Sequence, residues 1–274
     1  MAEPRNTRVA VAQMTSTDDV AQNLAATARC VERAAGQGAE LVLLPECFAF
    51  LGPEEGKLRI AEPLPTGGPI LEACRELAIA HRVHLVLGGH WEIAGEDGKV
   101  HNACVHLDAS GAVQAVYRKI HLFDVDLPDG TRLLESATVA PGDEVATTTM
   151  PFGALGLSVC YDLRFPELYR RLVDKGAVAL AVPAAFTMTT GKDHWHVLLR
   201  ARAIEQQSYV LAAAQTGRHF GKRVSYGHAL ISDPWGTVLA QCGEGEGVAV
   251  ATIEPEVIRS IRASLPSLAH RRLS

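Results

Sequence analysis

Short apolar runs with almost no polar interruption alternate along this chain with segments of helical spacing. The runs cover residues 8–14, 40–44, 83–88, 155–159, 177–182, 209–214 and 248–253. The helical segments cover residues 18–35, 69–81, 166–175, 194–206 and the stretch after residue 254. A strand that is apolar along its whole length is typical of a sheet covered on both faces. The alternation therefore predicts an α/β fold in which helices cover the sheet.

Two predicted hairpins complete the pattern, and nothing divides the chain into parts. Residues 100–107 and 112–118 flank a turn-forming tetrad at 108–111, and residues 226–232 and 236–239 flank a second one at 233–236. The sequence contains no linker, internal repeat or low-complexity stretch. Because a chain of 274 residues can form one α/β domain, we expect a single domain over residues 1–274.

The composition argues against nucleic acid and membranes as partners. The formal net charge is −5, and the chain has no basic run that would attract a phosphate backbone. The longest apolar runs, such as residues 177–185, are far shorter than the roughly 20 residues that span a bilayer. The first eight residues are polar and lack the apolar core of a signal peptide. We therefore expect a cytoplasmic protein.

Cysteine and histidine usage gives no sign of disulfides or of a metal. The six cysteines, at positions 30, 47, 74, 104, 160 and 242, occur singly and form no Cys-x-x-Cys pair. Such cysteines are usually reduced and serve as small core residues, so a reactive one needs a separate argument. The close histidine pairs at 81/84, 101/106 and 194/196 have no acidic or cysteine partner at metal-site spacing. The sequence predicts no metal and no cofactor.

Reactive side chains follow three of the predicted strands. Glu46 comes after the run 40–44, Lys119 after 112–118 and Cys160 after 155–159. Ligands bind beyond the carboxyl ends of strands in open α/β sheets, so these side chains can converge on one site. A carboxylate accepts a thiol proton, and an ammonium group stabilises both a thiolate and an oxyanion. Taken singly, however, each residue is more often an ordinary surface or core residue, and spacing alone leaves both interpretations open.

The segments around these residues resemble the three signature blocks of the nitrilase, or carbon–nitrogen hydrolase, superfamily. They read Leu-Leu-Pro-Glu-Cys at 43–47, Tyr-Arg-Lys-Ile-His-Leu-Phe-Asp at 117–124 and Cys-Tyr-Asp-Leu-Arg-Phe-Pro-Glu-Leu at 160–168, in the family order. The likeness runs from residue 9 to residue 272. Stretches 117–128, 160–168, 194–219 and 225–242 most resemble the deaminated glutathione amidase branch, and ω-amidases are close relatives.

This resemblance implies a nitrilase fold, which is a four-layer α-β-β-α sandwich of two stacked sheets. It also implies a homodimer or larger even oligomer, paired through helices near the nucleophile. The predicted helix at 194–206 fits that role because it mixes several large apolar residues with arginines.

The resemblance also implies a role for each residue of the site. Cys160 is the nucleophile, Glu46 the general base and later the general acid, and Lys119 with the backbone N–H of Tyr161 binds the oxyanion. Glu135 matches a second glutamate that holds the lysine. Arg164 matches an arginine that grips an α-keto carboxylate, and Thr187 assists it. The cationic residues of the stretch 200–205 and of the loop 218–223, which most resemble the deaminated glutathione branch, are expected to meet the distal carboxylate of a tripeptide-like substrate. The alternative for Arg164 is a structural salt bridge with Glu167 or Asp162.

The implied activity is that of a thiol amidase. It hydrolyses the primary amide of a small, carboxylate-bearing substrate to an acid and ammonia through a cysteine thioester. Deaminated glutathione is the first expected substrate and α-ketoglutaramate, the ω-amidase substrate, is the alternative; nitriles come third. An acyltransferase, in which an amine resolves the thioester, and a catalytically silent binding protein stay open.

Overall fold

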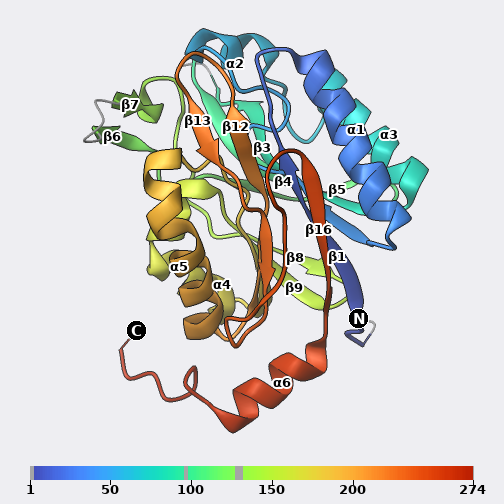
Figure 1. Cartoon of the computed structure of the whole chain (residues 1–274), viewed down its shortest axis with the longest axis vertical. Coiled ribbons are helices and arrows are strands. Elements are labelled where there is room, and N and C mark those ends of the chain that lie inside the picture. The colour runs from blue at the N-terminus through green and yellow to red at the C-terminus, as the bar shows by residue number, and fades with distance from the viewer. Residues whose placement is uncertain (1–2, 96–97, 127–131, 274) are drawn as a thin grey trace.

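Two β-sheets lie face to face between two pairs of helices in the computed structural model, which describes residues 3–95, 98–126 and 132–273 (Figure 1). The first sheet runs in the order β13 (Val224–Tyr226), β12 (Ala214–Arg218), β1 (Thr7–Met14), β2 (Leu41–Leu43), β3 (His84–Ile93), β4 (Val100–Leu107), β5 (Val113–Arg118), with β16 (Gly247–Ile253) also paired to β1. The second sheet runs in the order β15 (Val238–Gln241), β14 (Leu230–Ser232), β11 (Tyr209–Ala212), β10 (Ala177–Ala181), β9 (Gly153–Leu157), β8 (Thr147–Met150). A separate ribbon pairs β6 (Asp124–Asp126) with β7 (Arg132–Leu134).

Helices cover the outer face of each sheet. Helices α1 (Val20–Gly36) and α3 (Pro69–His81) pack on the first sheet, and α4 (Pro166–Asp174) and α5 (Met188–Gln206) pack on the second (Figure 1). The short α2 (Glu54–Ile60) and the C-terminal α6 (Pro255–Ser264) lie outside these pairs. The expected four-layer α-β-β-α sandwich is confirmed.

Burial of both faces explains the continuous apolar runs of the central strands, whereas β16, which carries the run 248–253, is largely half-buried. On β1, Val9 and Val11 face the second sheet, whereas the intervening Ala10 and Ala12 face the outer helices, and all four are fully buried. Neighbouring strands β1, β2 and β3 are parallel, as are β9, β10 and β11. Parallel strands end at the same edge of their sheet. The residues that follow β2 in the first sheet and β9 in the second come together between the sheets, because Glu46 and Cys160 line one cavity.

Two predicted strands each turn out to serve both sheets. The run 209–214 ends as β11 at Ala212 in the second sheet, and the chain restarts at Ala214 as β12 in the first. The run 226–232 is divided in the same way between β13 and β14. The division falls at Gly227 and His228, which both adopt positive φ angles, of 79° and 61°. Apolar periodicity cannot reveal such crossings, because both halves are equally buried.

Other boundaries shift by a few residues. Helix α5 begins six residues earlier than predicted, at Met188, where the Thr187 side chain caps its first turn. Asp19 caps α1 by accepting a hydrogen bond from the Gln22 N–H. Helix α2 and the β6–β7 ribbon were not predicted, and residues 127 and 128 of the family-like block lie outside the described residues.

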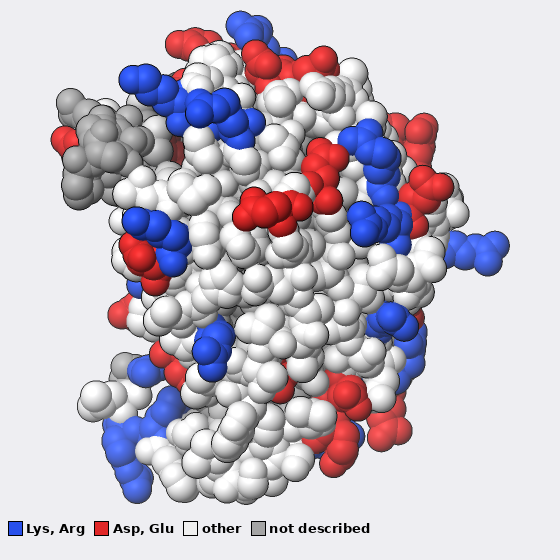
Figure 2. Space-filling model, in the orientation of Figure 1, with Lys and Arg blue, Asp and Glu red and all other residues white. Residues whose placement is uncertain are grey.

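Surface properties agree with the modest net charge. On the face shown in Figure 2, acidic and basic side chains are interspersed over most of the surface, apart from a small basic group at the upper left. Among the described residues, no helix is both long enough and apolar enough to cross a membrane. A single domain over residues 1–274 stays a prediction.

Candidate active site

Glu46 lies just beyond the end of β2 with its carboxylate buried between the sheets. The residue is 4% exposed. Its Oε1 accepts hydrogen bonds from Lys119 Nζ and from Asn102 Nδ2, both at 3.0 Å, and its Oε2 accepts one from the Ala185 N–H at 3.0 Å. Three donors therefore fix this carboxylate in place.

Lys119 follows β5 and points its ammonium group between two carboxylates. The side chain is 1% exposed, and its Nζ lies 3.0 Å from Glu46 Oε1 and 2.8 Å from Glu135 Oε2. Glu135 begins the 3₁₀ turn η1 (Glu135–Ala137) after β7, and its Oε2 also accepts the Phe123 N–H. The expected contact between Glu135 and Lys119 is present in the structure.

Cys160 opens the 3₁₀ turn η2 (Cys160–Arg164), three residues beyond the end of β9. Its φ of 50° is in the left-handed region, which is strained for a side chain with a Cβ atom and is often found at functional sites. The Cys160 N–H donates to the Pro183 carbonyl at 2.9 Å, which holds the turn against the chain that follows β10. In this position the thiol lines the same cavity as the Glu46 carboxylate, whose charge acts on it.

The charges of the three groups can be assigned from their surroundings. Burial and the charge of Glu46 raise the pKa of the Cys160 thiol well above its ordinary value, so the resting group is a neutral thiol. Burial also raises the pKa of the Glu46 carboxyl. The neighbouring Lys119 charge and Cys160 thiol lower it by more, so the pKa of Glu46 is below its ordinary value. Burial lowers the pKa of Lys119, yet Glu135 and Glu46 together raise it well above its ordinary value. The resting site thus holds a thiol, a carboxylate and an ammonium ion.

Two cavities meet at Cys160. The large cavity, of about 580 Å³, is lined by Glu46, Lys119, Glu135, Arg223 and side chains of α2 and the segment before it. The small cavity, of about 220 Å³, is lined by Tyr161, Arg164, Thr187 and neighbouring aromatic residues. Cys160, Phe123 and Ala185 line both. The structure therefore brings all the expected site residues to one place, on two sides of the thiol.

Arg164, for which the sequence left a salt bridge with Asp162 or Glu167 open, lines the small cavity. An Arg164 guanidinium nitrogen lies 3.2 Å from His194 Nδ1, and the guanidinium carbon lies 5.3 Å from the centre of the Phe186 ring. Within the described part of the chain, Arg164 forms no ion pair with Asp162 or Glu167, so a structural salt bridge does not account for it. Thr187 lies beside it, capping α5 through Thr190.

Three further residues belong to the site, of which Asn102 and Asp162 have no role predicted from the sequence. Asn102 on β4 donates to both Glu46 and Glu135. Asp162 is fully buried and accepts hydrogen bonds from the Tyr117 hydroxyl, the Val159 N–H and both the N–H and ring Nδ1 of His121. Arg223 lines the large cavity. A polar residue inside an apolar strand was the available signal for Asn102, and the basic loop at 218–223 was the signal for Arg223.

Cys47 lies beside Glu46 and lines the large cavity but not the small one, and its φ of 58° is left-handed like that of Cys160. Burial and the neighbouring Glu46 charge raise the pKa of the Cys47 thiol to about 12. All six cysteines are free and buried. Among the described residues, no group of three or more His, Cys, Asp or Glu side chains is arranged to hold a metal ion.

A model of the carbon–nitrogen hydrolase family matches residues 8–263 of this chain. The chain belongs to this family. It is 48% identical over 265 residues to a Synechocystis deaminated glutathione amidase, covering 96% of this chain and 97% of that protein. It is also similar to Saccharomyces cerevisiae Nit3, a member of branch 10 of the nitrilase superfamily, with a TM-score of 0.89, 32% identity, and 98% and 97% of the two chains covered.

A third similar protein is an amidase from Nesterenkonia sp. AN1. The TM-score is 0.78 at 27% identity, and the match covers 95% of this chain and 98% of that one. That structure is of a glutamate-to-glutamine mutant in which acrylamide has undergone Michael addition at the active-site cysteine. The family match and these relatives show that this chain is an enzyme that acts on amides.

Proposed function

We propose that this enzyme is a thiol amidase that cleaves deaminated glutathione through a thioester on Cys160. The observation that carries the proposal is that one buried carboxylate, Glu46, accepts a hydrogen bond from the Lys119 ammonium group and lines the same cavity as the Cys160 thiol. The name of the Synechocystis relative, which matches over 96% of this chain, supports the choice of substrate.

The first half of the reaction forms the thioester. Glu46 accepts the Cys160 proton as the sulfur attacks the amide carbon, and the carbonyl oxygen becomes an oxyanion. The Lys119 ammonium group and the backbone N–H of Tyr161 stabilise that oxyanion. The protonated Glu46 then gives its proton to the departing amine as the C–N bond breaks. Glu135 contributes by holding the lysine in place.

The second half hydrolyses the thioester. Glu46, again a carboxylate, takes a proton from a water molecule that attacks the thioester carbon. Lys119 and the Tyr161 N–H stabilise the second oxyanion. Collapse of this intermediate releases the carboxylic acid and returns the proton from Glu46 to the Cys160 sulfur. The cycle balances without a cofactor.

The amine released from the proposed substrate is not the ammonia that is expected from the sequence. Glutathione is γ-glutamylcysteinylglycine, so its deaminated form joins a five-carbon α-keto acid to cysteinylglycine through a secondary amide. Hydrolysis releases cysteinylglycine in place of ammonia. The ammonia-releasing primary amide is the chemistry of the alternative substrate, α-ketoglutaramate. Both substrates share the α-keto carboxylate, for which we propose Arg164, with Thr187, as the binding residue, because a guanidinium pairs with a carboxylate in bidentate fashion.

The test compares two amides on the purified enzyme. We expect a higher kcat/KM for deaminated glutathione, measured as cysteinylglycine release, than for α-ketoglutaramate, measured as ammonia release. Cys160→Ala should abolish turnover of both, and Cys47→Ala should keep most of it. Stoichiometric iodoacetamide modification that inactivates the enzyme should map to Cys160. A clear preference for α-ketoglutaramate would instead assign the enzyme as an ω-amidase.

The same assay tests the remaining alternatives and the keto-acid pocket. Arg164→Ala should raise KM for both keto-acid amides, and Arg164→Lys should restore it only in part. An acyltransferase would form a new amide when amines are added, and a silent binding protein would release no product from any amide. We also propose that the enzyme is a cytoplasmic homodimer; its six free thiols suit a reducing compartment.

A further inference from the structure

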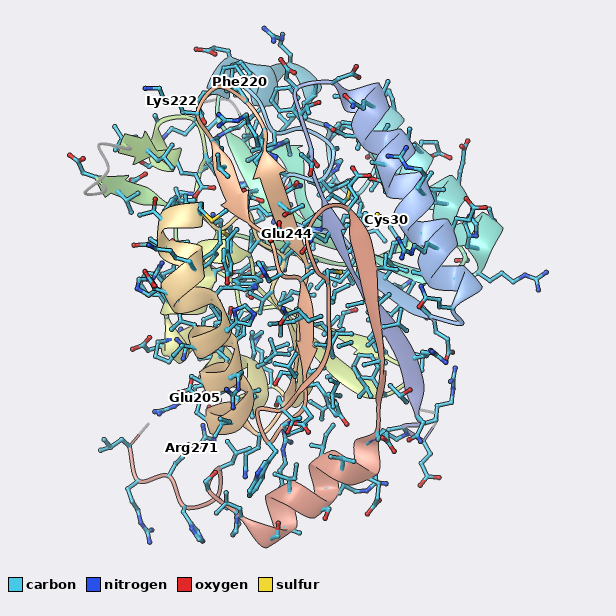
Figure 3. All side chains as sticks on the ribbon, in the orientation of Figure 1. Cys30, Glu205, Phe220, Lys222, Glu244 and Arg271 are labelled. Atoms are coloured by element: carbon cyan, nitrogen blue, oxygen red, sulfur yellow. The ribbon has the colours of Figure 1, made fainter. Side chains whose placement is uncertain are left out.

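Arg223 lines the large cavity but takes no part in the reaction described above. It lies at the base of the tight turn that joins β12 to β13, where its N–H donates to the Phe220 carbonyl and its carbonyl accepts the His219 N–H. Phe220 and Lys222 mark the tip of this hairpin in Figure 3. Two backbone bonds therefore fix the point from which the Arg223 side chain reaches the cavity that also contains Glu46 and Lys119.

Arg223 is also a cation of this cavity that forms no ion pair with a described carboxylate, although its charge helps to lower the pKa of Glu46. Lys119 is paired with Glu46 and Glu135, and Lys57 on α2 is paired with Glu54. No described residue forms an ion pair with Arg223, and its Nε is buried without a hydrogen-bond partner among the described residues. A buried guanidinium nitrogen in that state is costly unless a ligand supplies the acceptor.

The surroundings of Arg223 favour an anion. Basic side chains gather at the upper left of the face in Figure 2, where Figure 1 places the tip of the β12–β13 hairpin. Arg218, Lys222 and Arg223 all belong to this hairpin. The arginines of α5 are occupied elsewhere, because Arg200 donates to the Gly236 carbonyl and the buried Arg202 donates to the Leu163 carbonyl. Neither of these lines the two cavities.

The position of Glu46 decides which end of the substrate enters the large cavity. Glu46 lines the large cavity and is absent from the lining of the small one. The group that gives a proton to the departing amine must lie within hydrogen-bond reach of its nitrogen. The leaving group therefore extends into the large cavity, and the acyl group extends toward Arg164 on the other side of Cys160. The larger volume on the leaving-group side suits the larger of the two fragments.

We propose that Arg223 is a specificity-determining residue that binds a carboxylate carried by the leaving amine. This inference rests on the proposed function and deepens it. In deaminated glutathione the carboxylate is that of the C-terminal glycine. The two arginines then bind the two ends of one dianionic substrate, with the scissile amide at Cys160 between them.

The experiment removes the Arg223 side chain and the terminal carboxylate of the substrate separately. Wild type, Arg223→Met and the matched control Lys222→Met are assayed with deaminated glutathione and with its C-terminal carboxamide, which lacks only the terminal charge. A hydrogen-bonded charge pair predicts that Arg223→Met raises KM for deaminated glutathione about tenfold or more, with kcat little changed. The variant should cleave the carboxamide as wild type does. Lys222→Met, which removes an exposed charge from the same hairpin, should leave both substrates unaffected.

The outcomes separate this inference from the function on which it rests. If Arg223→Met lowers kcat/KM equally for both substrates, the residue acts through Glu46 or through the fold, and the inference is overturned. An unchanged KM for deaminated glutathione overturns it as well. Failure of the wild-type enzyme to cleave deaminated glutathione refutes the proposed function itself, before any variant is compared.

Discussion

Asn102 Nδ2 lies 3.0 Å from Glu46 Oε1 and 3.3 Å from Glu135 Oε1, so one amide group joins the two carboxylates of the site. Asn102→Ala removes a donor from the ionised Glu46. A hydrogen bond to a charged group is worth about 1.5–3 kcal/mol, so we expect kcat to fall about tenfold or more. Steady-state kinetics on the proposed substrate, with a melting curve to check the fold, measures this. An unchanged kcat would show that Asn102 has only a structural role.

Glu135→Gln should lose activity and keep its fold. The Glu135 carboxylate accepts two hydrogen bonds from the Lys119 ammonium group and holds it for the oxyanion. Loss of a positioned oxyanion donor costs about 10²–10³ in rate, and we expect kcat to fall by that range. The circular dichroism spectrum and the melting temperature serve as the check on folding. A variant with near-native kcat would contradict the role proposed for Glu135.

Glu46→Gln should make the Cys160 thiol easier to ionise while it abolishes amide hydrolysis. After burial, the charge of Glu46 is the largest influence that raises the pKa of this thiol, and Lys119 lowers it. The substitution removes the first charge and leaves the second, so the pKa of Cys160 falls. The midpoint of the pH profile of iodoacetamide modification at Cys160, mapped by mass spectrometry, should therefore shift to lower pH. A midpoint that stays or rises would show that Glu46 does not control the thiol.

Asp162→Asn should destabilise the fold as well as the site. This fully buried carboxylate ties the Lys119 strand end to the Cys160 turn by accepting from Tyr117, His121 and Val159. An asparagine would point an N–H₂ group at donors, and each mismatched buried group costs about 1–3 kcal/mol. We expect the free energy of unfolding to fall by at least that amount in urea titration. The exposed Asp174, paired with Arg271, supplies the control Asp174→Asn, which should cost less than about 1 kcal/mol.

The predicted dimer should depend on the outer face of α5. Two of the apolar residues that suggested an interface, Trp195 and Leu199, are fully buried within the subunit, but Val197 is 66% and Ile204 49% exposed. Val197→Glu should shift the mass measured by light scattering at micromolar concentration toward the monomer. Ile79→Glu, at a 53% exposed position on α3 of the opposite layer, should leave the mass unchanged. A monomeric wild type would refute the dimer outright.

The sequence alone determined most of the layers and the chemical character of the site. Continuous apolar runs such as residues 8–14 require cover on both faces, and the structure provides it through alternate residues such as Val9 and Ala10. Helix bounds followed from local signals, since Asp19 can cap α1 and Pro69 can begin α3. The three reactive residues were recognisable because their segments carry the family-like blocks.

Only the tertiary structure decided where the chain crosses between sheets and what surrounds the thiol. The crossings at Ala213 and Gly227 are invisible to periodicity, because strands in either sheet are buried alike. The contacts of Asn102, Asp162 and Arg223 join segments that are far apart in sequence, and no local pattern encodes such distances. The pKa of Cys160 likewise depends on burial and on charges brought from other strand ends. The sequence supplied the reactive groups. The fold set the distances between them, and their protonation states and catalytic roles depend on those distances.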